Sequence, residues 1–268
     1  LFVSSLASAN GAYLTNTMDV YMNSNVNGTE TETYACNSTD IQRDGFSTTA
    51  CAPYVNVNKL GYYYYQVNVR NLNFGNNLFL DKTYHVYSDK LYQEYRIVNY
   101  GDTAASLNFI AFQAVMPVSA VTKFEISDGA NVVSSLQEGD GEYQVISNPQ
   151  YAAFDIAGVG VVGFINSTAE NCDFVIIRKG SNYYFRQRYF VTAVEAKGAA
   201  GFGSRVYTDS THTFDGIRAA NAEENNPLTA AEITVSGDGA SFVGYDRLRG
   251  YYVCKIDGSW FAPAGEYP

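Results

Sequence analysis

Pairs of Asp-Gly and Asn-Gly recur along this chain and divide it into short segments. Such pairs favour two-residue hairpin turns, because both central residues of the turn adopt positive φ. Asp-Gly begins at Asp44, Asp128, Asp140, Asp215, Asp238 and Asp257, and Asn-Gly begins at Asn10 and Asn27. This punctuation leaves little room for long helices, so we expect short strands joined by tight turns.

Segments rich in aromatic and β-branched residues lie between the turns, and such residues suit a pleated, half-buried surface. They are Tyr62–Val69, Tyr84–Tyr87, Tyr92–Val98, Ala105–Val115, Val121–Ile126, Tyr143–Ile146, Val159–Ile165, Phe174–Ile177, Tyr183–Val194, Ile233–Val235, Ser241–Tyr245 and Tyr251–Ile256. Helical periodicity is confined to Ala193–Ala200 and to Gly216–Glu224, which stops before Pro227. The pattern predicts an all-β protein, an antiparallel β-sandwich or barrel.

Composition excludes several classes of protein and of partner. Hydrophobic residues make up 46% of the chain and charged residues only 16%, which argues against a disordered chain or a coiled coil. With 17 basic and 27 acidic side chains the net charge is −10, so we expect no nucleic-acid partner. The longest apolar runs, such as Ile156–Ile165, are shorter than the roughly 20 residues of a membrane-spanning helix.

The four cysteines contain no CxxC pair and lie far from both histidines in sequence, so a zinc site is a poor interpretation. Four cysteines allow three pairings, and we favour Cys36–Cys51 and Cys172–Cys254. The alternative is four buried free thiols. An even number of cysteines in an acidic chain rich in Tyr, Asn and Thr favours an oxidising compartment, and hence a secreted or cell-surface protein.

Glycosylation sequons begin at Asn27, Asn37 and Asn166, a number that chance alone would give. The first two fall in a polar segment, 23–53, which we expect to be an exposed loop closed by the Cys36–Cys51 bridge. The domain prediction is therefore an N-terminal arm, 1–14, followed by one β-sandwich domain, 15–268, that carries this insertion.

The N-terminal arm opens with apolar residues, and Ala7-Ser8-Ala9 resembles the end of a signal peptide. We expect processing upstream of Leu1. Chain ends fray unless they are tied down, so an apolar N-terminal segment is expected to pair as a strand, either in its own sheet or in that of a neighbouring molecule.

Candidate catalytic and metal-binding groups are few. His212 lies near Asp209 and Asp215, and a histidine beside carboxylates can act as a general acid or base on a sugar; a solvated loop histidine is the alternative. His85 is expected to be packed or exposed without chemistry. Carboxylates at Glu138, Asp140 and Glu142 could hold Ca²⁺, with simple hairpin turns as the alternative, and we predict no other metal or cofactor.

Two aromatic runs, Tyr62–Tyr65 and Tyr183–Phe185, place rings on both faces of their strands. One face must pack inward. The other face can meet a neighbouring subunit, stack on sugar rings or simply coat the sheet.

Two family resemblances add expectations. Residues Tyr92–Phe109 (a strand, an Asn-x-Gly-Asp turn and a return strand) together with Asn10–Thr17 resemble secreted fibre subunits of the TasA/camelysin kind and archaeal bundling-pilus and thread subunits. That resemblance implies a jelly-roll subunit whose N-terminal strand completes the sheet of the next molecule. The same strand pair and Tyr183–Val191 also resemble the supersandwich domains of mutarotases and polysaccharide lyases.

The resulting functional prediction is a non-enzymatic subunit of an extracellular filament or surface layer, with other copies of itself as partners. Residues 1–14 would be donated to an open sheet edge of the next subunit, with apolar anchors at Phe2, Val3, Leu6, Tyr13 and Leu14. The alternative is a secreted carbohydrate-binding or carbohydrate-cleaving sandwich that contacts surface glycans through exposed tyrosines, with His212 and Asp215 as its catalytic pair.

Overall fold

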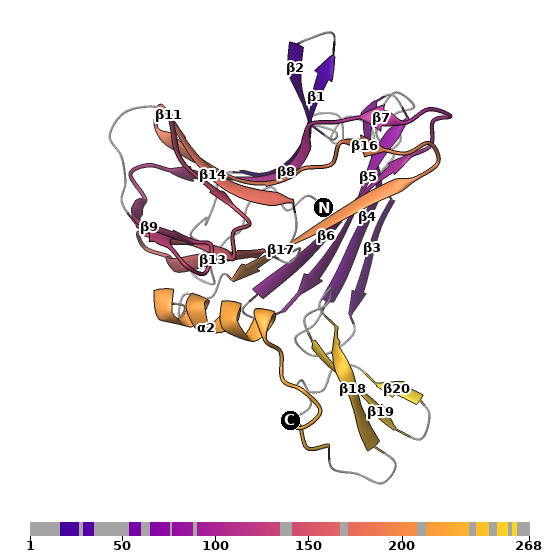
Figure 1. Ribbon diagram of the computed structural model, residues 1–268, viewed down its shortest axis with the longest axis vertical. Helices are drawn as coiled ribbons and strands as arrows, with labels where there is room; N and C mark the ends of the chain where they lie inside the picture. Colours follow the sequence, from indigo (N-terminus) through magenta and orange to yellow (C-terminus); the bar gives the residue numbers. More distant parts are fainter. Residues whose placement is uncertain are drawn as a thin grey trace.

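The computed structural model confirms an all-β protein: in the part of the chain that it describes, two antiparallel sheets face each other and one helix lies outside them (Figure 1). The structure describes residues 17–26, 29–34, 54–59, 65–75, 77–87, 90–134, 141–166, 171–207, 213–235, 240–246, 251–256 and 259–261. The predicted donor arm, 1–14, lies outside these residues.

The large sheet has nine strands, all paired antiparallel. In spatial order they are β10 (Val132–Val133), β9 (Val121–Ser127), β12 (Tyr151–Ile156), β13 (Gly160–Asn166), β17 (Ala199–Tyr207), β6 (Lys90–Asn99), β5 (Leu78–Val86), β4 (Tyr65–Gly75) and β3 (Tyr54–Lys59). Strands β3 to β6 follow one another in sequence and in space, as expected for segments joined by short turns.

The small sheet has six strands. In spatial order they are β11 (Gly141–Ser147), β14 (Cys172–Lys179), β15 (Asn182–Tyr189), β8 (Phe109–Pro117), β1 (Thr17–Val26) and β2 (Thr29–Tyr34). Val26 pairs with Thr29, so the connection between β1 and β2 consists of Asn27 and Gly28, the length that an Asn-Gly hairpin needs. Residues 23–26 and 29–34 of the expected insertion therefore belong to a β-hairpin, and 35–53 lie outside the described residues.

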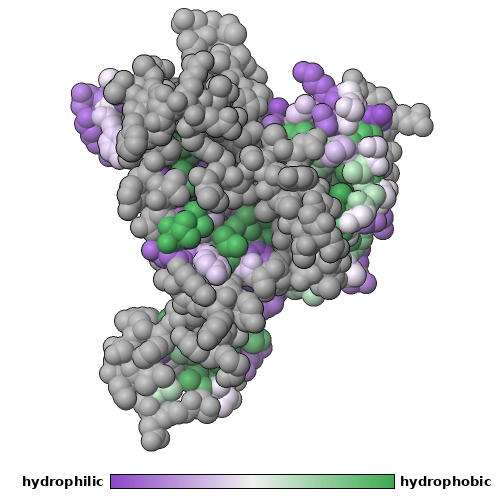
Figure 2. All heavy atoms as spheres, turned by 180° about the vertical axis from the view of Figure 1, so that it is seen from behind, coloured by the Kyte–Doolittle hydropathy of each residue, from purple (hydrophilic) through white to green (hydrophobic). Residues whose placement is uncertain are grey.

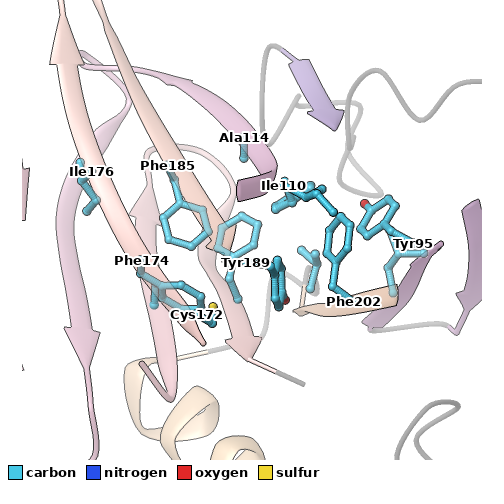
Figure 3. Packing of buried hydrophobic residues seen from close by; sticks show 14 of the residues in the cluster. Tyr95, Ile110, Ala114, Cys172, Phe174, Ile176, Phe185, Tyr189 and Phe202 are labelled. Carbon is cyan, nitrogen blue, oxygen red and sulfur yellow. The ribbon is translucent and has the colours of Figure 1, made fainter. Parts of the chain in front are cut away.

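The core lies between the two sheets and is built from alternate residues of each strand. Strand β15 shows the alternation most clearly, because Tyr183, Phe185 and Tyr189 point inward and are buried while their neighbours are half-buried. Phe185 contacts Phe174 of its own sheet, with ring centroids 5.1 Å apart (Figure 3). It also contacts Phe164 of the large sheet, with ring centroids 4.6 Å apart. Truncating one such buried ring to alanine typically costs about 3–5 kcal/mol, so this packing joins the two sheets.

Helix α2 (Phe214–Asn225) covers the outer face of the large sheet over β12 and β13. Its buried Ile217 packs against Tyr151, Ala153, Val161, Ile165 and Tyr207. A Cβ at Gly163 would lie only 2.4 Å from Cδ1 of Ile217, so glycine is what lets the helix approach the sheet. The helix predicted at Gly216–Glu224 is thus confirmed.

Three sequence predictions of local structure are wrong. Ile233–Val235, expected as a strand, lies outside every strand of the structure. Residues Ala193–Ala200 form no helix but the short strand β16 (Ala193–Val194), paired with β7 (Ala105–Ser106), and the start of β17. Pairing with β6 outweighs helix propensity there. Asp215-Gly216 makes no hairpin turn, because Thr213 accepts a hydrogen bond from the Gly216 N–H and begins helix α2, whose first turn favours an acidic residue.

The predicted Cys172–Cys254 disulfide is also wrong, since both thiols are free. Cys172 lies on β14 with its side chain in the core, whereas Cys254 lies on β19 (Tyr251–Ile256), in a separate sheet. Burial, and after it the nearby Asp173, raises the pKa of the Cys172 thiol, which therefore stays protonated and unreactive. Cys36 and Cys51 lie outside the described residues.

A three-stranded sheet follows helix α2 and comprises β18 (Ala240–Asp246), β19 and β20 (Ser259–Phe261). Figure 1 shows it beyond one end of the sandwich, next to the C-terminal end of the helix. Within the described residues it shares no strand pairing with either large layer. The Tyr252 hydroxyl accepts a hydrogen bond from the backbone N–H of Leu228, which ties this sheet to the segment after the helix.

Candidate functional site

Asp215 is the member of the predicted catalytic pair that the structure describes. Its carboxylate is exposed and forms an ion pair with Arg218 on the next turn of helix α2. Arg218 in turn donates two hydrogen bonds to the buried carboxylate of Glu125, at 2.8 and 2.6 Å. Asp215 therefore belongs to a structural ion-pair chain. His212 lies outside the described residues, so the predicted pairing of the two stays a prediction.

Burial raises the pKa of Glu125, but hydrogen bonds from Arg218 and from the Tyr151 hydroxyl outweigh it, and the net pKa is lowered. This carboxylate is thus ionised and fully engaged in holding helix α2 on strand β9. Lys123 on the same strand lies over the Phe214 ring, 4.7 Å from its centroid, and supports the first turn of the helix.

Asn166 lies at the end of β13, and its side-chain amide is engaged on both sides. Nδ2 donates to the backbone oxygen of Pro149 at 3.0 Å, and Oδ1 accepts from Nε2 of Gln187 at 3.3 Å. The other predicted glycosylation sites, Asn27 and Asn37, and all five predicted polymer anchors lie outside the described residues.

Exposed aromatic and aliphatic side chains are scattered over the described surface. In Figure 2 the coloured apolar residues form several separate groups. Tyr183 and Phe185 face the core and Tyr184 is half-buried on the other face, while Tyr65 is exposed at the start of β4. The large exposed hydrophobic residues come from different elements: Val57, Tyr65, Tyr100, Val132, Phe190, Leu228 and Val243. Residues 62–64 lie outside the described part of the chain, so the role expected for the aromatic runs stays a prediction.

The outer face of β4, β5 and β6 gathers polar side chains in register. Thr83 lies opposite Asn68 and Glu94, and in the next row Asp81 lies opposite Arg96. Oδ1 of Asn68 accepts hydrogen bonds from Thr83 and from Arg70, at 3.1 and 3.2 Å. These groups come from three strands, so only the sheet register brings them together.

His85 and Glu94 form the most distinctive pair on this face. Nε2 of His85 lies 2.9 Å from Oε1 of Glu94, and because a carboxylate accepts hydrogen bonds, Nε2 carries the proton. The His85 side chain is 1% exposed, whereas that of Glu94 is 32% exposed. The buried imidazole therefore fixes the accessible carboxylate, and among the described residues no hydrogen bond to Oε2 of Glu94 is present.

Arg96 follows two residues after Glu94 and lies on the same face, about 7 Å further along the strand. It is exposed, and no described residue forms an ion pair with it. Its neighbour on β17 is Gly201, where an added Cβ would meet the surroundings no closer than 3.5 Å. We call the surface formed by Glu94, Arg96 and Gly201 the β6 strip: a carboxylate and a guanidinium beside a position without a side chain.

Asp81 is the second carboxylate near the strip. It is nearly buried and lies 3.4 Å from Nη1 of Arg70. Asp81 and Glu94 are diagonal neighbours on adjacent strands, with Cβ atoms roughly 7 Å apart. The ion pair and the burial leave Glu94 as the carboxylate that a ligand can reach.

A buried ion pair lies beside this face, where helix α2 meets the large sheet. Glu224 accepts hydrogen bonds from the hydroxyls of Tyr92, Tyr207 and Tyr245, and Arg205 lies 3.2 Å from its Oε2. The Arg205 Nε–H does not point at the carboxylate, so this contact is an ion pair without a good hydrogen bond. The Arg205 guanidinium also lies over the Tyr92 ring, 4.8 Å from its centroid.

Burial raises the pKa of Tyr92, Tyr207 and Tyr245, and the charge of Glu224 adds to this effect. All three hydroxyls therefore stay protonated and can donate to the carboxylate. This cluster joins β6, β17, helix α2 and the C-terminal sheet, and we assign it a structural role.

No group of three or more metal-ligating side chains is present in the part of the chain that the structure describes. The predicted calcium ligands Glu138 and Asp140 lie outside that part. Nor do the described residues include a helix long and apolar enough to cross a membrane.

Comparison with known proteins finds no family model and no curated protein that matches this chain. Among solved structures it is similar to a Paenibacillus xanthan lyase (TM-score 0.45, 9% identity, 76% of this chain and 20% of that one). It is also similar to the GH36 α-galactosidase AgaB of Geobacillus stearothermophilus (TM-score 0.45, 11% identity, 79% and 30%). A third is an aldose 1-epimerase-like protein of Klebsiella pneumoniae (TM-score 0.48, 12% identity, 77% and 65%). The chain thus spans less than two thirds of each.

The sequence analysis missed the β6 strip. His85 and Glu94 are nine residues apart and on different strands, and the expectation for His85 was a packed or exposed residue without chemistry. The available signal was that the charged residues Glu94 and Arg96 are two positions apart and so lie on one face of a strand, but this spacing alone does not identify the neighbours of that face.

Proposed function

We propose that this protein binds carbohydrate through the β6 strip. The observation that carries the proposal is the pair formed by Glu94 and Arg96: a partly exposed carboxylate and an exposed guanidinium on one face of strand β6. A carboxylate accepts hydrogen bonds from sugar hydroxyls, and a guanidinium donates to them.

Three features support this site over an ordinary charged surface. The buried His85 imidazole hydrogen-bonds to the Glu94 carboxylate and fixes it, so the Glu94 side chain loses less conformational freedom when a ligand binds. Gly201 leaves space beside Arg96 for a ring. The remaining polar groups of the face, such as Asn68 and Thr83, bond to one another, which leaves Glu94 and Arg96 for the ligand.

Should the protein also act on its carbohydrate, Glu94 is the residue placed to transfer a proton. A general acid or base must reach the reacting oxygen, and Glu94 is the accessible carboxylate of the Asp81–Glu94 pair. His85 is buried behind it and would act as a positioning residue.

Binding is tested by glycan-array screening of the wild-type protein, followed by isothermal titration calorimetry with the best ligand. Glu94→Gln removes the charge at nearly constant shape and is expected to weaken binding by about 10- to 100-fold, since hydrogen bonds to charged groups contribute about 1.5–3 kcal/mol. Gly201→Leu fills the space beside Arg96 and is expected to abolish binding while the melting temperature stays within a few degrees.

The matched control is Asp102→Asn, which makes the same charge change beyond the end of β6, where Asp102 pairs with Lys197 in solvent. It is expected to bind like the wild type. Equal affinity of Glu94→Gln and wild type would contradict the proposed site, and the absence of any carbohydrate ligand would contradict the function.

Assembly into filaments, the function expected first from the sequence, stays a second proposal. One observation favours it: β3 is the last strand of the large sheet, and among the described residues it pairs with β4 alone. A donated strand could add to that edge. Electron microscopy of the native protein tests this, with Phe2→Asp/Leu6→Asp expected to abolish polymers and Ser4→Asp/Ser5→Asp, which adds the same charge, expected to keep them. Normal fibres from the first variant would contradict strand donation.

A further inference from the structure

Among the described residues, three polar atoms in the interior of the sandwich have no hydrogen-bond partner: Nε2 of Gln93, Oε1 of Gln187 and Oγ of Ser204. Their residues are 2%, 0% and 0% exposed. Nearly all buried polar groups in folded proteins are paired, either with protein or with ordered water. Three unpaired atoms in one core therefore call for a shared explanation.

Strand register and one hydrogen bond bring the three side chains into the same neighbourhood between the sheets. Gln93 on β6 lies directly opposite Ser204 on β17, and Ser204 lies opposite Asn166 on β13. These three form one cross-strand row on the inner face of the large sheet. Gln187 reaches the same row from β15 of the small sheet, because its Nε2 donates to Oδ1 of Asn166 at 3.3 Å.

For each glutamine, the partner of the other amide atom shows whether the unpaired atom is a hydrogen-bond donor or an acceptor. Oε1 of Gln93 accepts from the Tyr95 hydroxyl, which leaves Nε2 as a free donor. Nε2 of Gln187 donates to Asn166 and to the oxygen of Tyr189, whose own hydroxyl proton is donated to the backbone oxygen of Gly203. Oε1 of Gln187 is thus a free acceptor, and the Ser204 hydroxyl can do either.

The surroundings of this row are aromatic. The Phe202 ring lies between those of Tyr95 and Tyr189, with centroids 4.8 and 4.5 Å away, and Figure 3 shows the three rings in a line that joins the two sheets. The position is therefore closed to bulk solvent, and none of the three unpaired groups carries a charge.

We propose that one buried water molecule occupies this place and bridges Gln93, Gln187 and Ser204. It accepts a hydrogen bond from Gln93, donates one to Gln187 and completes its shell at Ser204, three partners being typical of a buried water. A cation would meet the N–H of Gln93, and an anion would meet the lone pairs of Gln187 Oε1, so a small neutral molecule that both donates and accepts is required. This water is a structural part of the protein that connects the two sheets.

The bridge also bears on strand β6. Gln93 and Tyr95 flank Glu94 in sequence and point to the opposite side of the sheet. Fixing them between the sheets therefore also fixes the backbone segment that presents Glu94 on the outer face.

A crystal structure of the wild-type protein at about 1.8 Å or better tests the proposal directly. We expect one isolated density peak within hydrogen-bonding distance of all three atoms. An empty site, a peak that touches none of them, or direct hydrogen bonds among the three side chains would overturn it.

A solution measurement complements the crystal. Oxygen-17 magnetic relaxation dispersion counts long-lived internal waters, and Gln187→Met, which removes the acceptor at similar volume, is expected to lower that count by one. The control is Gln66→Met on the half-buried outer face of β4, which should leave the count unchanged. An unchanged count in folded Gln187→Met protein would overturn the proposal; should that variant fail to fold, the wild-type crystal structure decides.

Discussion

Glu224 offers the sharpest test of how helix α2 and the C-terminal sheet are held on the sandwich. The side chain is 5% exposed and receives three tyrosine hydroxyls, and its counter-ion Arg205 is equally buried. Glu224→Gln keeps the shape but removes the charge, so the Arg205 guanidinium is left buried without a counter-ion. Breaking a buried pair in this way typically costs about 3–5 kcal/mol.

For a chain of this size, 1 kcal/mol lowers the melting temperature by about 2–4 °C, so we expect a decrease of roughly 6–20 °C. Differential scanning fluorimetry and urea unfolding measure this effect. The matched control is Glu223→Gln, the same change on the exposed neighbouring residue, which should alter stability by no more than about 0.5 kcal/mol.

The double variant Glu224→Gln/Arg205→Met removes both charges and should recover much of the loss, because no unpaired ion remains. Equal melting temperatures for the wild type and Glu224→Gln would refute the structural role of this cluster. So would equal effects of Glu224→Gln and Glu223→Gln.

Four further predictions follow from the same structure. Arg218→Gln should destabilise by about 1–3 kcal/mol, whereas Asp215→Asn should have little effect. The pKa of Glu125 is lowered in the folded state. The stability that Glu125 contributes is therefore present above its unfolded pKa of about 4.3 and is lost as the pH falls through its folded-state pKa. Chemical denaturation across pH 2–7 would measure this loss. Gly163→Ala should lower the free energy of unfolding by about 1–3 kcal/mol, because the added methyl group overpacks against Ile217. Combined with Ile217→Ala, its effect on the free energy of unfolding should be less than additive, and full additivity would contradict the contact. Thiol titration of the native, non-reduced protein should leave Cys172 unmodified until denaturant is added and modify half-buried Cys254 faster, and mass spectrometry that finds the two linked would contradict the free thiols.

The class of the fold was predictable from the sequence because its signals are local. Alternation along Tyr183–Val194 predicted a strand with an apolar inner face, and β15 has that face in the core. The helix before Pro227 was likewise readable, since a breaker acts on its immediate neighbours, whereas the hairpin strands β1 and β2 were not predicted.

Local signals failed where a neighbouring element competed. Asp215-Gly216 is a good turn pair, but Thr213 supplies a helix cap and Ile217 finds a buried position over Gly163, so the helix prevails. Ala193–Ala200 lost its predicted helix because its residues complete strand pairings with β7 and β6.

The candidate site and the cysteine pairing were decided by tertiary structure alone. His85 meets Glu94, and Gln187 meets the row of Gln93 and Ser204, through strand register and the stacking of two sheets, and neither is encoded in the spacing of those residues along the chain. The same holds for Cys172, which the alternation of β14 turns into the core, away from the sheet that carries Cys254. Short-range preferences act between residues a few positions apart, so the sequence by itself determined the fold class and many of the strands, although β1, β2, β3 and β12 were not predicted. Their partners were decided by which faces bury one another.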